Sequence, residues 1–389
     1  MILGIDASNI SVGGGLTHLK EILRSVEYGN HDFKKIVIWS SKNTLNEIEE
    51  RPWLKKCSDP MVEKSYLYRA LWQHKKLSIR LVEEKCDILF VPGGVYTTKF
   101  RPVVAMSQNL IPFELKEILR YGVSILALKF FLLRIFQSGS LKKADGTIFL
   151  TKYAKESVLK VTKSLKGYSL VIPHGIDKKF FKPPRPQNLI NKFSLKIPYQ
   201  VLYVSNIEPY KHHHNVIDAI VKLYNKGFPL VLKLIGSGNS TEMKRINKKI
   251  KNVDPDRKII NYVGFVTHDK LPSHYFSSNI FLFASSCENM PITLMEAMAS
   301  GAPIVCSDRS PMPELLEKSA EYFDPENSES IALAIQKMIE SPKLRTEKAK
   351  TAFEKAQKFS WGRCSTETFS FLSKILEDYK NLVLGDISK

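Results

Sequence analysis

The stretch SSCENMPITLMEAMASGAPIVCSD, from Ser285 to Asp308, decides the fold of this chain. The apolar run IFLFASS leads into it and predicts a buried strand; a helix is expected to begin near Pro291 or Ile292. Gly301 stands where that helix should end, and the next strand is expected from Pro303. Such a strand–turn–helix unit presents free backbone N–H groups and a positive dipole end at the edge of the sheet. The stretch therefore predicts an α/β unit with a site suited to a diphosphate.

Apolar runs of strand length alternate with helical patterns on both sides of a proline-rich connector. The runs before it are KKIVIWSS, CDILFVPGG, PVVAMSQN and ADGTIFLT, and those after it are YQVLYVSN, LVLKLIGSG, KIINYVGF, IFLFASS and APIVCSD. Five prolines lie between Pro173 and Pro198, and proline stiffens extended chain. We therefore expect two Rossmann-like, doubly wound α/β domains facing a central cleft, residues 1–178 and 179–367, with a C-terminal helix of about 368–389 packing back on the first.

The composition indicates a globular protein with an anionic partner. Of 389 residues, 43% are hydrophobic and 25% charged, and the five scattered cysteines form no CxxC pair. The N-terminus, MILGIDASNI, has the pattern of a first strand and not of a signal peptide. The net charge of +19 favours nucleic acid, an anionic membrane or a phosphorylated substrate as partner. No common nucleic-acid-binding signature is found, so the membrane is preferred and no nucleic acid is expected.

The Ser285–Asp308 stretch resembles the E-x7-E signature of retaining GT-B glycosyltransferases of the large family 4. Glu288 and Glu296 have the required spacing, and the stretch continues as EAMA and then GAPI. Pro291 comes one position earlier than in the commonest form of the motif. Further similar features are Gly13-Gly14-Gly15, the hinge-like IPHGID from Ile172, the segment Tyr203–Lys211 and Phe359-Ser360-Trp361. The similarity covers nearly the whole chain and implies the GT-B fold.

The resemblance implies a role for each part of this motif. Glu296 should bind the ribose hydroxyls of the nucleotide, since a carboxylate accepts two hydrogen bonds from a vicinal diol. Glu288 should approach the donor sugar at the reacting face. The diphosphate should be held by the backbone at Asn289, Met290, Pro291 and Ile292, with Thr293, and the donor site should include Gly236. An alternative for Glu296 is purely structural, because Thr293-x-x-Glu296 also fits a capping box.

A second group of donor residues is expected in VLYVSNIEPYKHHH, from Val201 to His214. Relatives carry a Gly-Arg pair where this chain has Ser205-Asn206, whereas Lys211 matches their lysine. Lys211 must therefore stabilise the leaving diphosphate largely alone; the alternative is a solvated loop lysine. The run from His212 to His214 is interpreted as a surface helix start, and neither a metal nor a cofactor is expected.

Acceptor residues are expected in the first domain. Gly13, Gly14 and Gly15 should lie between a strand ending near Ser8 and a helix starting near Leu16, where glycine lets the backbone approach phosphate or acceptor. Gln108 and Asn109 should end a strand facing the cleft, and we expect Asn109 to hydrogen bond the acceptor or donor sugar.

Residues 115–167 form the candidate membrane segment. They carry eleven Lys and Arg against three acids around the apolar run YGVSILALKFFLLRIF, which starts at Tyr121 and is too short to span a bilayer. An apolar helix flanked by cations can lie in an anionic interface. The alternative is a core helix of the first domain.

These features together indicate a hexosyltransferase-type glycosyltransferase, cytoplasmic and peripheral to the inner face of the plasma membrane. It would move a sugar from a UDP- or GDP-sugar to a glycan or lipid-linked glycan in cell-surface polysaccharide or lipopolysaccharide assembly. Three alternatives stay open: a GT-B sugar-nucleotide epimerase, a basic nucleic-acid-binding protein, and a catalytically weakened partner subunit.

Overall fold

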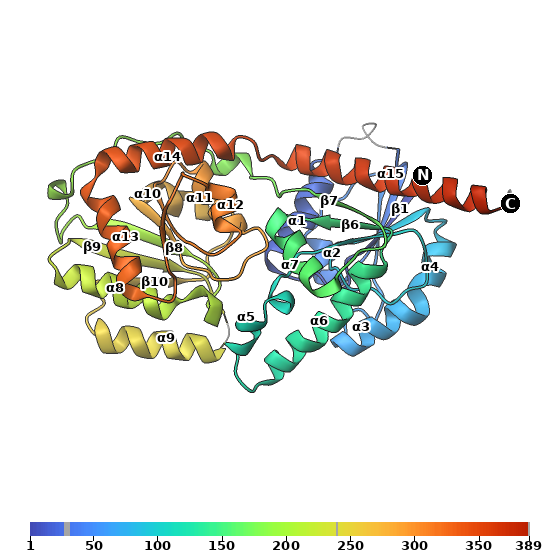
Figure 1. Cartoon of the computed structure of the whole chain (residues 1–389), viewed down its shortest axis with the longest axis horizontal. Helices are drawn as coiled ribbons and strands as arrows, with labels where there is room; N and C mark the ends of the chain where they lie inside the picture. The colour runs from blue at the N-terminus through green and yellow to red at the C-terminus, as the bar shows by residue number, and fades with distance from the viewer. Residues whose placement is uncertain (27–31, 239, 388–389) are drawn as a thin grey trace. The chain divides into compact units, whose positions relative to one another are not determined.

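The computed structural model describes residues 1–26, 32–238 and 240–387, which form two compact units (Figure 1). Unit 1 comprises Met1–Ile118, Gly122–Gly175 and Ser360–Lys389, and unit 2 comprises Leu119–Tyr121 and Ile176–Phe359. Both units are parallel α/β sheets with helices packed on them, as the strand–helix alternation predicts.

Unit 1 is built on a seven-stranded parallel sheet in the order β3-β2-β1-β4-β5-β6-β7. Its strands are β1 (Ile2–Asp6), β2 (Lys35–Trp39), β3 (Leu54–Cys57), β4 (Ile88–Val91), β5 (Val103–Met106), β6 (Gly146–Phe149) and β7 (Tyr168–Val171). Strand order reverses between β1 and β4, where Gly4 pairs with Leu89. Ligands of open α/β sheets bind beyond the carboxyl ends of the strands at such a reversal.

The helices of unit 1 follow its strands along the chain, except that the last one comes after unit 2. They are α1 (Gly13–Arg24), α2 (Lys42–Asn46), α3 (Tyr66–Trp72), α4 (Ser78–Glu83), α5 (Leu115–Leu119), α6 (Ile125–Lys143), α7 (Lys152–Thr162) and α15 (Trp361–Ile387), with a π turn at Gln73–Leu77 and a 3-10 turn at Ile111–Phe113. Helix α15 lies against α1 (Figure 1). The last helix therefore belongs to unit 1, although the chain has passed through unit 2 before it.

Unit 2 is built on a six-stranded parallel sheet in the order β10-β9-β8-β11-β12-β13. Its strands are β8 (Tyr199–Val204), β9 (Leu230–Ile235), β10 (Ile260–Gly264), β11 (Ile280–Phe283), β12 (Ile304–Ser307) and β13 (Glu321–Phe323). Its helices are α8 (His213–Asn225), α9 (Ser240–Val253), α10 (Leu271–Ser277), α11 (Ile292–Ala299), α12 (Met312–Leu316), α13 (Ser328–Glu340) and α14 (Pro342–Ala356), with 3-10 turns at Lys178–Phe180, Ile190–Lys192 and Pro209–Lys211. Every residue of β11 is fully buried, which explains its unbroken apolar sequence.

Three strands were not predicted, and all three lie at sheet edges, although the edge strand β10 was predicted from KIINYVGF. β3 and β7 are the two edges of the first sheet, and β13 is an edge of the second. An edge strand has one neighbour and a partly exposed face, so its sequence lacks a continuous apolar run. The sequences LKKC, YSLV and EYF show this mixture.

The unit boundaries differ from those expected at residues 178 and 367. The chain leaves unit 1 after Gly175, and it returns at Ser360. The second difference arises because α15 begins at Trp361 and continues without interruption to Ile387. The expected second domain therefore included the first turns of a helix that packs on unit 1.

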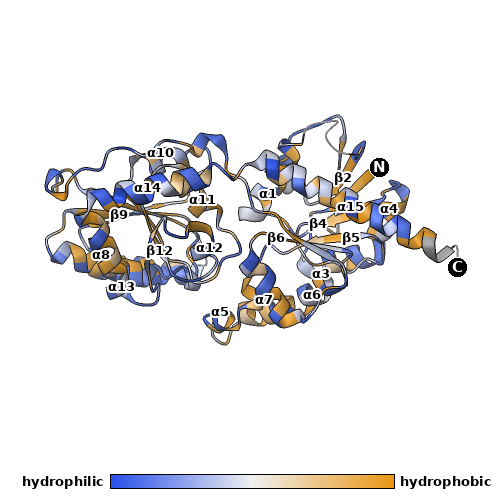
Figure 2. Cartoon of the chain, turned by 45° about the horizontal axis from the view of Figure 1, so that its top comes forward, coloured by the Kyte–Doolittle hydropathy of each residue, from blue (hydrophilic) through white to orange (hydrophobic). Residues whose placement is uncertain are grey.

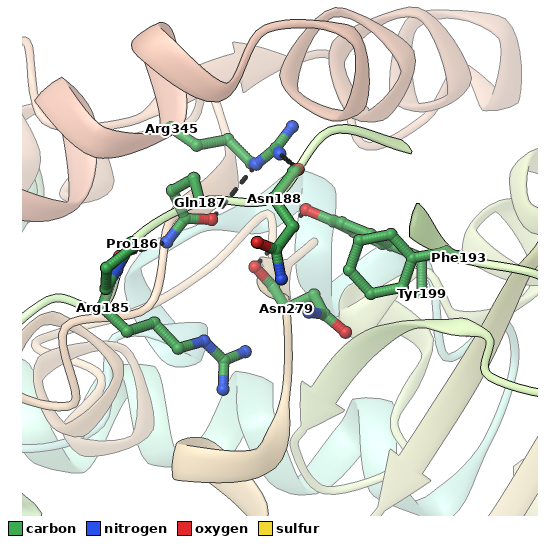
Figure 3. A pocket seen from close by; sticks show the side chains of 8 residues that line it. All are labelled: Arg185, Pro186, Gln187, Asn188, Phe193, Tyr199, Asn279 and Arg345. Atoms are coloured by element: carbon green, nitrogen blue, oxygen red, sulfur yellow. Dashed lines mark hydrogen bonds between the residues drawn. The ribbon is translucent and has the colours of Figure 1, made fainter. Parts of the chain in front are cut away.

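Residues of the proline-rich connector are tied to unit 2 by two arginines (Figure 3). Arg345 is buried and donates to Gln187 Oε1 and to the backbone oxygens of Asn188, Met338 and Ile339. Arg185 donates to two backbone oxygens at the end of α10. Among the described residues no carboxylate pairs with Arg345, and these bonds satisfy its guanidinium instead, beside a pocket of about 180 Å³.

Candidate functional site

Lys211 and Glu288 form a shielded ion pair in unit 2. Lys211 ends the 3-10 turn after β8, and Glu288 lies in the turn between β11 and α11. Only 9% of the Lys211 side chain and 14% of the Glu288 side chain are exposed, and Lys211 Nζ contacts Glu288 Oε1. The interpretation of Lys211 as a solvated loop lysine is therefore wrong.

The surroundings of Lys211 hold its ammonium group at the carboxyl end of the sheet. Its Nζ lies 5.1 Å from the ring centre of Tyr210 and 5.2 Å from that of Phe283. The Tyr203 hydroxyl donates to the Lys211 backbone oxygen at 2.7 Å. Aromatic faces stabilise a cation, and a single backbone anchor limits where it can move. The arrangement places one positive charge beside one carboxylate at the carboxyl ends of the strands.

Helix α11 begins at Ile292 after Pro291, close to the position predicted from the sequence. Pro291 at its N-cap position forms no side-chain cap, and the first N–H groups of a helix have no partner within the helix and can bind an anion. Asn289 and Met290 are buried in the turn before it, and Thr293 is half-buried in its first turn. The diphosphate-binding role of this turn stays a prediction.

Glu296 lies inside α11 and is the centre of a hydrogen-bonded network. Its side chain is 2% exposed; Oε1 lies 2.7 Å from His268 Nε2, and Oε2 accepts from the Tyr275 hydroxyl at 3.0 Å. Burial raises the pKa of the Glu296 carboxyl, and the bonds from His268 and Tyr275 oppose that rise. The capping-box alternative is wrong, because the helix starts at Ile292 and Glu296 is in its second turn, bonded to other elements.

Lys179 selects the tautomer of His268. Lys179 Nζ lies 3.1 Å from His268 Nδ1, and an ammonium can only donate there. Neutral His268 therefore carries its proton on Nε2 and donates it to Glu296. Lys179 Nζ also lies 3.4 Å from Asp177 Oδ2, so the contacts run from Asp177 through Lys179 and His268 to Glu296.

Sequence reasoning did not identify His268, Tyr275 or Lys179. His268 follows β10 in the order of the chain, so its place after the carboxyl end of a parallel strand was an available signal. Tyr275 and Lys179 offered no such signal, because they come from α10 and from the 3-10 turn after the unit boundary.

Ser205, Asn206 and Gly236 lie in the adjoining loops after β8 and β9. The Ser205 hydroxyl is buried and donates to the backbone oxygen of Asn206 at 2.8 Å, whereas the Asn206 side chain is exposed. Gly236 has φ +140°, and a Cβ there would collide with the Ser205 backbone oxygen. Ser205 and Gly236 thus let the two loops approach closely. That Ser205, Asn206 and Gly236 bind the sugar nucleotide stays a prediction.

His212 and His213 are buried, so the expected surface location is wrong. Helix α8 does begin at His213, but its first turn points inward: the His213 ring stacks on Tyr203, with centres 4.8 Å apart. Burial lowers the pKa of His213 to about 3 and that of His212 to about 4. In the described residues, no group of three or more His, Cys, Asp or Glu side chains could hold a metal.

A pocket of about 570 Å³ in unit 1 brings together three of the predicted acceptor residues, Gly15, Gln108 and Asn109. A Cβ on Gly15 would lie 2.7 Å from Gln108 Oε1, so glycine leaves room for that amide. Gly13 and Gly14 are exposed and do not line this pocket. The expected position of the three glycines before the helix is wrong: α1 begins at Gly13, and they form its first turn.

Helix α6 carries most of the apolar run of the candidate membrane segment and exposes much of it. Ile125 is 89% exposed, Leu128 59% and Ile135 67%, and Figure 2 shows the apolar character of this helix. The core-helix alternative is therefore wrong for these side chains, although Ala127 and Phe130 pack inward. In the described part of the chain, no helix is both long and apolar enough to cross a membrane.

The sequence profile of the family Glycosyl transferases group 1 matches residues 161–355, half of the chain. The chain belongs to this family. The O-antigen chain mannosyltransferase B of Escherichia coli is 25% identical over 185 residues, which are 47% of this chain and 48% of that protein. The chain thus spans about half the length of that curated relative.

Solved structures share the fold of nearly the whole chain. The sucrose-phosphate synthase of Thermosynechococcus elongatus matches with a TM-score of 0.76 and 17% identity, over 97% of this chain and 100% of its own. HepE of Anabaena in complex with UDP-glucose matches with a TM-score of 0.71 and 17% identity, over 96% and 100%. At these identities the likeness establishes the fold alone. The predicted GT-B architecture is confirmed.

Proposed function

We propose that this chain is a retaining glycosyltransferase that moves a sugar from a nucleotide-diphosphate donor to a glycan or lipid-linked glycan. The observation that carries the proposal is the shielded Lys211–Glu288 pair, whose carboxylate lies in the turn that leads into the first turn of α11. One ammonium group and a set of free N–H groups are what a departing diphosphate needs, because its negative charge grows as the glycosidic bond breaks.

The chain's own residues suit a front-face reaction. The acceptor hydroxyl attacks the anomeric carbon from the side on which the diphosphate leaves, and a leaving phosphate oxygen takes its proton. Lys211 stabilises the departing oxygens, and Glu288 lies against the reacting face of the sugar. Glu296 holds the ribose through its buried carboxylate, which His268 and Tyr275 orient. Catalysis on this scheme rests on positioning and on charge stabilisation.

A nucleotide-sugar donor is supported by the fold shared with HepE, whose structure contains UDP-glucose. A polysaccharide acceptor is supported by the similarity to an O-antigen chain mannosyltransferase. We propose a UDP- or GDP-sugar as donor and cell-surface polysaccharide assembly as the process. No metal ion or cofactor is proposed.

The proposed location is the cytoplasmic side of the plasma membrane, with residues 115–167 against the anionic surface. Exposed apolar side chains of α6 and the eleven cations of the segment support this placement. Co-sedimentation with anionic vesicles at low salt should retain the wild-type chain, and Leu128→Ser with Ile135→Ser should reduce the bound fraction. Recovery of all the wild-type protein in the supernatant would refute the membrane placement.

The enzymatic proposal is tested first by melting the protein with UDP, GDP, ADP and a short DNA duplex. One nucleoside diphosphate at about a hundred times its dissociation constant should add roughly 2.7 kcal/mol to the free energy of unfolding. The matching sugar donor is then incubated with the chain, and NMR follows the anomeric configuration of the product. Inversion would refute the retaining mechanism. Conversion of donor without acceptor would indicate the epimerase, and a melting shift with DNA alone would indicate a nucleic-acid-binding protein.

A further inference from the structure

The pocket of unit 1 carries two positive charges to which no role in the transfer reaction has been assigned. Arg69 of α3 and Lys129 of α6 both line it, and none of the described residues around it is acidic. Arg69 Nε donates to the backbone oxygens of Val62 and Lys64, which anchors the guanidinium base. Within the described residues, neither cation forms an ion pair. The two charges are therefore available to an anion in the pocket.

Neutral amides complete the polar lining. Asn9 Oδ1 is buried without a hydrogen-bond partner in the described structure, and Gln108 and Asn109 lie in the same pocket. Asn109 Oδ1 accepts from the Ile111 backbone N–H at 3.1 Å, which fixes the orientation of its amide. Amides of this kind can hydrogen bond hydroxyl groups beside a charged centre.

The two helices that supply the cations also expose apolar side chains. Leu67 and Leu71 of α3 are 74% and 45% exposed, and Leu128 and Leu132 of α6 are 59% and 46% exposed. The helices lie side by side in unit 1 (Figure 1; Figure 2) and line the same pocket. Leu132 lies three residues after Lys129 in α6, so the two side chains are neighbours on the helix surface, and Leu128 is a neighbour of Leu132 in the same way. A charged pocket with apolar side chains on two sides matches an amphiphile with an anionic headgroup.

We propose that the pocket binds the phosphate of a lipid-linked acceptor, with the negative charge between Arg69 and Lys129 and the lipid chain over the exposed leucines of α3 and α6. Two oxygens of a phosphate can accept parallel bonds from the two terminal nitrogens of a guanidinium, and the apolar chain covers surface that is otherwise in water. The amides hold the hydroxyl groups next to the phosphate. This inference rests on the proposed function, because it names the acceptor of that reaction.

Farnesyl phosphate is the probe, with inorganic phosphate and farnesol as its two halves. Calorimetric titration uses the full chain with saturating nucleoside diphosphate, so that the phosphate site of unit 2 is filled. Farnesyl phosphate should bind at least ten times more tightly than either half. Lys129→Gln should weaken the binding of farnesyl phosphate roughly five-fold, because one cation near an anionic group contributes about 1 kcal/mol. Arg69→Gln with Lys129→Gln should weaken it further, and Leu128→Ser with Leu132→Ser should reduce the advantage over inorganic phosphate.

Lys244→Gln with Lys248→Gln is the matched control, since it removes two exposed cations of α9 in unit 2. Lys129→Gln keeps the test valid if the Arg69 variant unfolds, because Lys129 is exposed and makes no ion pair in the described structure. Equal binding of farnesyl phosphate by wild type and Lys129→Gln, or equal binding of inorganic and farnesyl phosphate, would overturn the inference. Nucleoside diphosphate binding measured in parallel separates this failure from failure of the proposed function.

Discussion

Replacing Glu296 by glutamine should weaken nucleotide binding without unfolding the protein. The wild-type carboxylate is 2% exposed and accepts from His268 Nε2 at 2.7 Å and from the Tyr275 hydroxyl at 3.0 Å. Glutamine has the same shape but one acceptor oxygen and one NH₂ group. Either His268 Nε2 or the Tyr275 hydroxyl then faces the NH₂ group, which also donates. Only one ribose hydroxyl can then find an acceptor.

The size of the effect follows from the charge of the lost acceptor. A hydrogen bond to a charged group contributes about 1.5–3 kcal/mol, so losing one at the ribose weakens the dissociation constant roughly 10- to 150-fold. The loss in the free energy of unfolding is smaller. Burying the charged carboxylate has a desolvation cost that neutral glutamine largely avoids, and the raised pKa of Glu296 reflects that cost.

Isothermal titration with the nucleoside diphosphate that stabilises the wild type measures this loss. Glu329→Gln is the matched control, since Glu329 forms an exposed ion pair with Lys222 on the surface of the same unit. As pH falls through the raised pKa of Glu296, the wild type should lose affinity relative to Glu296→Gln, because protonation removes the acceptor. A folded Glu296→Gln protein with the wild-type dissociation constant would refute the ribose assignment.

Lys211→Met should lower kcat about 10²- to 10³-fold with little change in KM, because the cation acts on the departing diphosphate; a larger change in KM than in kcat would assign Lys211 to ground-state binding. Gly175→Ala should lower the free energy of unfolding by about 1–3 kcal/mol, since its Cβ would collide with backbone at the start of α15. Gly362→Ala has no neighbour within 4 Å and serves as control in urea unfolding; equal stability of the two variants would contradict the steric reasoning. His213→Phe should flatten the acid dependence of stability. Wild-type His213, with its pKa lowered from 6.5 to about 3, binds a proton only on unfolding, so stability falls as pH drops below 6.5, by about 2 kcal/mol at pH 5. Parallel pH profiles of the two proteins in urea titrations would show that His213 is not the titrating group.

The strands at the centre of both sheets were predictable because they are buried on both faces. Their apolar runs, IFLFASS above all, identify them without knowledge of any neighbour. The edge strands β3, β7 and β13 carry no such run, because their short sequences LKKC, YSLV and EYF mix polar and apolar residues. The start of α15 at Trp361 was also hidden, because a helix pattern does not say which unit the helix packs on.

Residues of the candidate site divide in the same way. Glu288, Glu296 and Lys211 lie in motifs with a recognisable spacing, so local sequence identified them. His268, Tyr275 and Lys179 come from three separate segments. His268 and Tyr275 meet Glu296, and Lys179 meets His268, only when unit 2 is folded. The burial of His212 and His213 likewise depends on which way the turn after β8 points.

The sequence by itself determined the α/β class, the central strands, the motif from Glu288 to Glu296 and the excess of positive charge. These features depend on composition and on residues close together in the chain. Only the tertiary structure decided that Glu288 pairs with Lys211, that His268 orients Glu296, and that Arg69 and Lys129 line one pocket. Contacts between distant segments depend on packing and loop direction, which no local pattern encodes.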